Sequence, residues 1–311
     1  MAQVSAVASG ADFAAGVKTF LGSCQWSMTT LGKASGVSPS AISQLLSGKY
    51  LGDSAAVRVK VESVMKREME KSVAAATSGG FIRTSVAVRV FDVAQDCRLF
   101  GDIGVCYSAA GLGKTEAVRE FARQNADVIL VEADPGYTAK FLFSEIRDIV
   151  GGGSSPRANL HDIFQECCKR LKGSGRLLIV DEAEQLPYKA LEMLRRLHGK
   201  TGVGILLTGM PKLLANLRGP RGEYAQLYSR VGLAVKLKPL TDADVALVIG
   251  RFLPKCPGKV QAALGSEAAG NARRLFKIIA RSKRVAQINH RDIDEEVVRR
   301  AAGTIKLEVM S

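Results

Sequence analysis

The sequence predicts an α/β fold in which helices cover both faces of a parallel sheet, with an all-α helix-turn-helix domain before the sheet and a small helical lid after it. Apolar runs of strand length alternate with amphipathic helical stretches in the middle of the chain, the order typical of a parallel sheet. Helical periodicity precedes this region, and no strand-like run follows Pro239. We therefore expect four segments, with bounds at 1–72, 73–80 (a linker), 81–239 and 240–311.

The composition is that of a folded protein. Of the 311 residues, 47% are hydrophobic and 24% are charged, which excludes a disordered or coiled-coil chain. No uncharged stretch reaches the roughly 18 residues of a membrane span, and the first cation is Lys18, so the basic start of a signal peptide is missing. Six cysteines without a C-x-x-C pair and three histidines do not have the spacing of a zinc site. We expect a cytoplasmic protein without a membrane partner.

The charge balance favours a polyanionic partner. Lys and Arg number 44 against 30 Asp and Glu, a formal net charge of +14, which favours nucleic acid. Between Arg195 and Lys238 nine cations stand against a single acid, Glu223. Glycine and proline interrupt this window around Arg218 and Arg221, so we expect these cations on loops, in contact with DNA phosphates. A solvated basic face that keeps the protein soluble is the alternative.

The N-terminal segment carries the pattern of a helix-turn-helix. Gly36 can turn the chain tightly after one helix, and Ser38 with Pro39 can start the next as N-cap and first helical residue. Gly32 stands where the two helices would cross closely. An ordinary helical hairpin without DNA function is the alternative. The candidate DNA contacts of the second helix and the residue just beyond it are Ser40, Ser43, Gln44 and Lys49.

Small uncharged residues at 74–80 predict the linker, and continuous apolar runs beyond it predict strands that are buried on both faces. The expected strands are Ile103–Tyr107, Val128–Val131, Leu177–Val180, Val203–Leu207 and Leu233–Leu237. The expected helices of the lid are Asp242–Phe252, Asn271–Val285 and Asp292–Ala302.

The run Ser108-Ala109-Ala110-Gly111-Leu112-Gly113-Lys114-Thr115 directly follows the first expected strand and opens a helix over Thr115–Asn125. A phosphate-binding loop needs glycines for close approach to the anion, a helix N-terminus, a lysine for the β- and γ-phosphates and a hydroxyl for magnesium. Gly111, Gly113, Lys114 and Thr115 meet these needs, so the loop predicts ATP and Mg²⁺ as ligands. Ser108 replaces the first glycine of the motif, and the turn into the loop therefore departs from the usual pattern.

A second element is the apolar strand that ends in Asp181 and Glu182. A parallel strand would deliver both carboxylates to the carboxyl edge of the sheet, beside the phosphate loop. We expect Asp181 to hold magnesium through water and Glu182 to orient and deprotonate the attacking water. A plain helix N-terminus, where the dipole favours acids, is the alternative.

These motifs resemble those of the AAA+ ATPases, and over most of its length the chain resembles the family of the transposition protein B of phage Mu. The resemblance implies an ATPase that assembles on double-stranded DNA with little sequence preference, selects target DNA and activates a transposase. The residues that carry it are Ser35-Gly36, Ile42-Ser43, Lys49-Tyr50, Gly52-Asp53, Gly111, Gly113-Lys114-Thr115-Glu116-Ala117, Lys169-Arg170, Asp181-Glu182-Ala183 and Leu227-Tyr228-Ser229-Arg230.

The resemblance also implies roles for single residues. Thr208 matches the polar sensor that holds the attacking water, and Arg230 matches the arginine finger that reaches the γ-phosphate of a neighbouring subunit. Arg273 matches the lid sensor that contacts nucleotide, with Arg274 as the alternative. The candidate ATP-binding residues are then Ser108, Ala109, Ala110, Gly111, Leu112, Gly113, Lys114, Thr115, Glu116 and Arg273.

The predicted recognition helix has almost no positive charge, so the main grip on DNA should come from the ATPase segment, since phosphate neutralisation supplies most non-specific affinity. Candidate contacts there are Lys169, Arg170, Lys172, Arg218 and Arg221. Stacking of subunits through Arg230 and ATP would repeat these weak contacts along a helical oligomer, and hydrolysis would release it. A helicase-loader-like remodeller and a DNA-binding regulator that uses ATP as a structural ligand are the alternatives.

Overall fold

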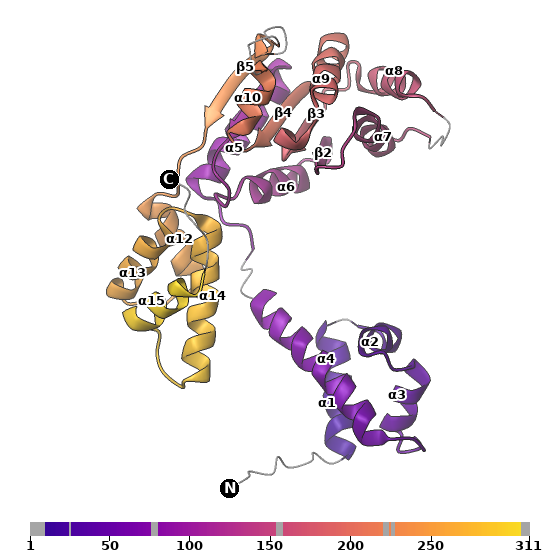
Figure 1. Ribbon diagram of the computed structural model, residues 1–311, viewed down its shortest axis with the longest axis vertical. Coiled ribbons are helices and arrows are strands. Elements are labelled where there is room, and N and C mark those ends of the chain that lie inside the picture. Colours follow the sequence, from indigo (N-terminus) through magenta and orange to yellow (C-terminus); the bar gives the residue numbers. More distant parts are fainter. Residues whose placement is uncertain are drawn as a thin grey trace. The chain divides into compact units, whose positions relative to one another are not determined.

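The chain divides into two structural units, Met1–Gly79 and Gly80–Ser311 (Figure 1). The computed structural model describes residues 10–24, 26–75, 80–153, 158–219, 224 and 228–305. No helix among these residues is both long and apolar enough to cross a membrane.

The first unit is helical throughout its described residues. Its helices are α1 (Gly10–Cys24), α2 (Met28–Ser35), α3 (Pro39–Leu46) and α4 (Ser54–Ala75). The last of these continues into the stretch expected to be a linker and ends at Ala75. Apolar side chains from all these helices share one core, which includes Phe13, Phe20, Leu31, Ile42 and Val61.

The turn between α2 and α3 has the features that the sequence predicts. Gly36 ends α2 at a φ of +66°, in the left-handed region that favours glycine. Ser38 caps α3, its hydroxyl accepting the N–H of Ala41 over 3.2 Å. A Cβ on Gly32 would lie 2.7 Å from the carbonyl oxygen of Val37, so the tight packing at this turn requires glycine.

The second unit is built on a parallel sheet, which has five strands in the described part of the chain, in the order β2-β3-β4-β1-β5. Figure 1 labels β2, β3, β4 and β5. The strands are β1 (Ile103–Tyr107), β2 (Val128–Glu132), β3 (Leu177–Asp181), β4 (Gly204–Gly209) and β5 (Val231–Lys236). All pairs are parallel, which confirms the predicted fold class. β5 begins two residues before the expected position and alternates between half-buried and exposed residues, as an edge strand does.

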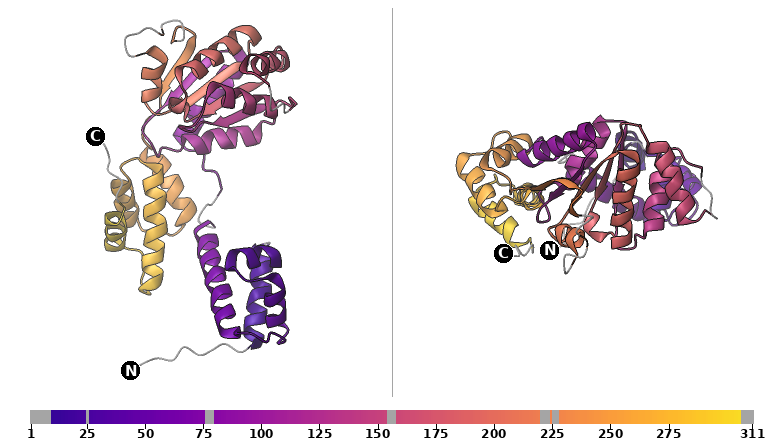
Figure 2. Two further views of the ribbon diagram at one scale, coloured as in Figure 1. Left: turned by 45° about the vertical axis from the view of Figure 1, so that its right-hand side comes forward. Right: turned by 90° about the horizontal axis from the view of Figure 1, so that it is seen from above.

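Helices cover both faces of the sheet (Figure 2). α5 (Ser85–Phe100) and α6 (Lys114–Gln124) pack on one face, where they meet Leu177 and Ile179 of β3. The neighbouring residues Leu178 and Val180 point to the other face. That second face is covered by α7 (Ala139–Ile149), α8 (Leu160–Leu171), α9 (Tyr188–Thr201) and α10 (Lys212–Arg218).

The lid follows the sheet and consists of α12 (Asp242–Phe252), α13 (Gly258–Ala268), α14 (Ala272–Ile288) and α15 (Glu295–Gly303). Its buried residues continue the core formed by α5 and α6. Asp244 is 3% exposed and ties α12 to α5. Its carboxylate accepts the N–H and the hydroxyl of Ser85, both at 2.6 Å, and the N–H and hydroxyl of Thr241, at 2.9 and 2.8 Å.

Candidate nucleotide-binding site

The loop between β1 and α6 has the backbone that phosphate binding requires. Gly111 and Gly113 have φ values of +86° and +99°, a conformation that favours glycine. Gly113 is the N-cap of α6, and no side chain caps this helix end. The first N–H groups of α6 are therefore free to bind an anion, and the positive end of the helix dipole favours this.

Lys114 is buried, and its ammonium group is held by the loop itself. Nζ donates to Ser108 O (3.1 Å), Ser108 Oγ (3.0 Å) and Ala109 O (3.2 Å). Burial lowers the pKa of Lys114, and the charges of the nearby acids Asp181, Glu182 and Glu184 oppose this change. The Ser108 hydroxyl thus supplies an acceptor that glycine would lack.

The backbone at Ser108 does not need the glycine that usually begins the motif. Its φ is not in the left-handed region, so the position does not require glycine. The side chain is 2% exposed, and the N–H donates to Gly209 O at the end of β4 over 3.2 Å. The turn into the loop is therefore anchored to the sheet.

Asp181 lies at the end of β3 and is 1% exposed. One carboxylate oxygen, Oδ1, accepts the hydroxyl of Thr208 from β4. The other, Oδ2, is buried and has no hydrogen-bond partner among the described residues. A buried carboxylate oxygen is costly to leave unpaired, and Mg²⁺ or its bound water is the partner that an oxygen ligand of this kind prefers. Asp181 therefore fits a magnesium site near the start of α6, the helix that carries Lys114 and Thr115.

Two further carboxyl groups follow Asp181. Glu182 has a φ of +52°, so its backbone is in the left-handed region, and it starts the short 3₁₀ helix η1 (Ala183–Gln185). Burial and the charges of Glu184 and Asp181 raise the pKa of Glu182. Asn216 Nδ2 donates to Glu184 O over 3.0 Å and ties η1 to α10.

Glu184 is a buried acid that the sequence reasoning did not single out. It is 6% exposed, and neither of its carboxylate oxygens has a hydrogen-bond partner within the described part of the chain. Oε2 occupies the space next to Gly209, where a Cβ would lie 2.2 Å away. The sequence signal was the spacing Asp-Glu-Ala-Glu, which reads equally well as the first turn of a solvated helix.

The lid reaches the phosphate loop at the start of α14. The N–H of Arg273 donates to Gly111 O over 2.9 Å, and the positive charge of Arg273 contributes to the lowered pKa of Lys114. Arg274 instead donates to Glu267 O over 2.5 Å and pairs with the Glu267 carboxylate at 3.5 Å. Of the two arginines proposed for nucleotide contact, Arg273 is therefore the one beside the loop.

Arg230 lies at the amino end of β5, whereas the phosphate loop of the same chain follows the carboxyl end of the neighbouring strand β1. It directly precedes β5, whose first residue Val231 is level with Ile103 at the start of β1. The loop follows Tyr107, which is level with Lys236 at the end of β5. Five residue steps of a strand separate these levels by about 16 Å. The fold therefore does not bring Arg230 to the site formed by Lys114 and Asp181.

Comparison with known proteins identifies the family. The AAA domain family matches residues 101–217. The Mu-like prophage FluMu DNA transposition protein B of Haemophilus influenzae is 30% identical over 236 residues, which are 75% of this chain and 82% of that protein. The chain belongs to the transposition protein B family.

Other relatives agree with this assignment. The ATP-dependent target DNA activator B of Escherichia phage Mu is 28% identical over 243 residues, 76% of each chain. Among solved structures, the Aeropyrum pernix ORC2 protein has a TM-score of 0.56 at 19% identity, over 72% of this chain and 68% of that one. This member of the transposition protein B family thus has the AAA+ fold of an ATP-binding protein.

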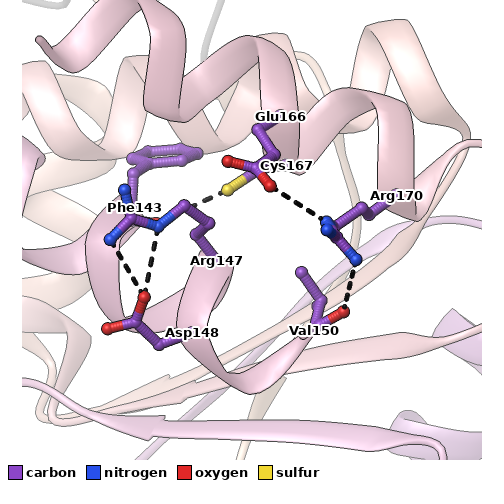
Figure 3. Close-up of polar contacts among 7 residues, drawn as sticks. All are labelled: Phe143, Arg147, Asp148, Val150, Glu166, Cys167 and Arg170. Carbon is purple, nitrogen blue, oxygen red and sulfur yellow. Dashed lines mark hydrogen bonds and ion pairs between the residues drawn. The ribbon is translucent and has the colours of Figure 1, made fainter. Parts of the chain in front are cut away.

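The described cations of the second unit that are proposed to contact DNA in this transposition protein B homologue lie on different elements, α8 and α10. Lys169, Arg170 and Lys172 are exposed at the end of α8. Arg170 is held in place, since Nε donates to Glu166 over 3.2 Å and Nη1 to Val150 O over 3.4 Å (Figure 3).

Arg147 lies beside this group but is buried, and it pairs with Asp148 at 3.0 Å (Figure 3). The exposed cations at the end of α8 are therefore the ones that could meet a phosphate.

The basic window between Arg195 and Lys238 differs from the expectation that its cations lie on loops. Arg195 and Arg196 lie on α9 and both pair with Glu192, at 2.8 and 3.0 Å. Arg218 ends α10, donates to Tyr228 Oη over 2.7 Å and stacks on the Tyr228 ring at 4.6 Å. Arg221 is outside the described residues. Glu192, which lies just before this window in the sequence, neutralises part of its positive charge through these ion pairs on α9.

The candidate DNA contacts of the N-terminal unit lie together on α3 and the residues after it. Ser40, Ser43, Gln44 and Lys49 are all exposed. The N–H of Lys49 donates to Gln44 O over 2.9 Å, which holds the chain beyond α3 against the helix end. The helix therefore presents polar side chains and leaves its apolar face, with Ile42 and Leu45, in the core.

Proposed function

We propose that this protein is an ATP-dependent DNA-binding protein that assembles on double-stranded DNA, selects target DNA and activates a transposase. The observation that supports the proposal is a phosphate-type loop whose Lys114 lies near the buried carboxylate of Asp181, in a member of the transposition protein B family. Relatives in that family are named as ATP-dependent target DNA activators.

ATP hydrolysis is assigned to the residues at the carboxyl edge of the sheet. Lys114 would exchange its loop acceptors for the β- and γ-phosphates, and Thr115 with Asp181 would hold Mg²⁺, which neutralises charge that develops on the phosphates. Glu182 would orient and deprotonate the attacking water. Thr208 acts through Asp181, whose carboxylate it already holds.

Assembly is assigned to Arg230. Arg230 lies at the amino end of β5 and cannot reach the phosphate loop of its own chain. This position supports contact between Arg230 and the ATP of a neighbouring subunit. Hydrolysis would then depend on stacking of subunits into a helical oligomer, and loss of the γ-phosphate would weaken the junction and release the DNA.

DNA contact is assigned to exposed cations of the second unit, together with the polar face of α3. Lys169 and Lys172 are exposed, and Arg218 can reach a phosphate only if its contact with Tyr228 is exchanged. Contacts of this kind bind phosphates and do not read bases. We therefore expect little sequence preference and an affinity that falls steeply with salt concentration.

Electron microscopy of the protein with duplex DNA in ATP, in ADP and without nucleotide tests the proposal, together with a phosphate-release assay with and without DNA. Filaments in ATP alone and DNA-stimulated hydrolysis are expected, and both should be lost in Lys114→Ala. A protein that stays monomeric at saturating ATP, or a Lys114→Ala variant that coats DNA as the wild type does, would overturn it.

A further inference from the structure

The start of the lid helix α14 is bonded to two carbonyl groups of the phosphate loop. Asn271 Nδ2 donates to Ala110 O over 3.0 Å, and the N–H of Arg273 donates to Gly111 O over 2.9 Å. Asn271 Oδ1 at the same time accepts the N–H of Arg274 over 3.0 Å and caps α14. One amide side chain therefore fixes the lid helix and the loop together.

The loop is shaped to receive this side chain. A Cβ on Gly111 would lie 2.5 Å from Asn271 Oδ1 and 2.8 Å from Nδ2, distances that real Cβ atoms do not tolerate. Any side chain at position 111 would therefore displace the amide. Gly111 is required for this contact as well as for its φ of +86°.

The two bonds set the direction of two backbone N–H groups. A trans peptide group is planar, so its C=O and N–H point in opposite directions. The Ala110 carbonyl shares its peptide group with the Gly111 N–H, and the Gly111 carbonyl shares its own with the Leu112 N–H. Because both carbonyls point toward α14, both N–H groups point away from it.

These N–H groups are available to a ligand. Among the residues that the structure describes, the Gly111 N–H has no hydrogen-bond partner, and the Leu112 N–H, in the turn closed toward Ala109 O, makes no hydrogen bond of normal geometry. Inward-pointing backbone N–H groups are the donors that a phosphate-binding loop offers to an anion. Holding them in one direction before the nucleotide arrives reduces the conformational entropy that binding must remove.

We propose that Asn271 is a positioning residue for ATP binding: it holds the Ala110 carbonyl and caps the helix that holds the Gly111 carbonyl, and so directs the Gly111 and Leu112 N–H groups toward the phosphates. This inference rests on the proposed function, since it requires that the loop binds ATP. It assigns Asn271 no contact with the nucleotide.

The test is Asn271→Ser in the full chain. Serine is a good N-cap, so the helix start is kept, but its side chain is too short to reach Ala110 O. We expect the Kd for ATP, measured by calorimetry with Mg²⁺, to rise about fivefold to tenfold, the effect of one lost hydrogen bond. The Kd for inorganic tripolyphosphate should rise by the same factor. KM should rise with kcat unchanged, because the lost contact acts on binding alone.

Asn159→Ser is the matched control. Asn159 caps α8, its side chain accepting the N–H of Asp162 over 3.0 Å, so the same chemical change is made at a helix start without contact to the phosphate loop. Asn159→Ser should keep the wild-type Kd for ATP and for tripolyphosphate.

A second variant, Asn271→Thr, also keeps a capping hydroxyl, is too short to donate to Ala110 O and adds no charge beside the phosphates. It decides the matter if Asn271→Ser loses its thermal unfolding transition. Wild-type Kd values in a folded Asn271 variant would overturn the inference. So would an equal loss in Asn159→Ser. Failure of the wild-type protein itself to bind ATP would instead overturn the proposed function, and the inference with it.

Discussion

Single residues at the carboxyl edge of the sheet differ in how they are held. Asp181 is fixed by Thr208 and Lys114 by the loop, whereas the Glu182 backbone sits in a left-handed conformation that is costly for a residue with a side chain. The chain keeps this conformation where the proposed general base must project from the end of β3. A catalytic role for Glu182 would explain why the chain keeps a strained backbone at this residue.

Glu182→Gln should bind ATP with wild-type affinity and hydrolyse it with a kcat lower by a factor of about 10² or more, since the amide cannot accept a proton. Calorimetry and phosphate release in the presence of DNA measure the two quantities. Glu295→Gln, on the lid helix α15, is the control and should leave both unchanged. An unchanged kcat in Glu182→Gln would remove this residue from catalysis.

Among the elements, the α2 to α3 turn depends on a missing side chain. A Cβ at Gly32 would press on the backbone oxygen of Val37 at 2.7 Å, and backbone cannot move aside cheaply. Gly32→Ala should lower the stability of the first unit by about 1–3 kcal/mol. Gly22→Ala, in α1, has nothing within 4 Å of the new Cβ and should raise it by about 0.5–1 kcal/mol. Urea unfolding of each variant measures the change, and equal effects would contradict the argument.

Attachment of the lid to α5 depends on the charge of Asp244. Burial opposes ionisation, but the hydrogen bonds from Ser85 and Thr241 outweigh it and hold the pKa of Asp244 below its ordinary value. A carboxyl group with a lowered folded-state pKa stabilises the fold above the unfolded value of about 3.9, and this stability is lost as the pH falls through the folded value.

Asp244→Asn should therefore lower the free energy of unfolding by about 2 kcal/mol at pH 7. The new amide N–H₂ group would face N–H and O–H donors of Ser85 and Thr241, which now donate to the carboxylate. The difference in unfolding free energy between the variant and the wild type should stay constant between pH 5 and pH 8, because the pKa of an unfolded Asp is about 3.9. It should shrink below about pH 4, where the wild-type carboxylate becomes protonated. Unfolding curves at several pH values check this. A difference that grows on acidification would contradict the assigned sign.

How much of the fold could be predicted depended on how local the signal was. The buried strands β1 to β4 are continuous apolar runs and were predicted to within one or two residues. β5 was placed two residues late because an edge strand alternates. α13 was missed, since Val260, Leu264 and Ala268 form only a thin apolar stripe.

The site shows the same limit. The loop, Asp181 and Glu182 belong to short motifs that a local pattern can single out, and the structure brings them close together. Asn271 lies 161 positions from Ala110, and no local pattern reports a contact over that separation. Glu184 was missed because its burial comes from packing against Gly209, which sequence spacing does not show.

At the scale of the whole molecule, Arg230 and the phosphate loop lie at opposite ends of two neighbouring strands, β5 and β1. We expect Arg230→Ala to bind ATP with wild-type affinity, yet neither to hydrolyse it nor to coat DNA. The decisive measurement mixes Arg230→Ala with Lys114→Ala. A junction that pairs the intact loop of the first with the intact arginine of the second is complete, so hydrolysis should return in the mixture. A mixture as inactive as its parts would contradict action between subunits.

The grip of the loop on its own lysine makes nucleotide capture an exchange reaction. The ammonium of Lys114 starts with two carbonyls and a hydroxyl as neighbours and would end with phosphate oxygens, so only the difference between the two sets of partners reaches the measured affinity. These three oxygens satisfy the buried cation, and the oxygens of a triphosphate would have to replace them.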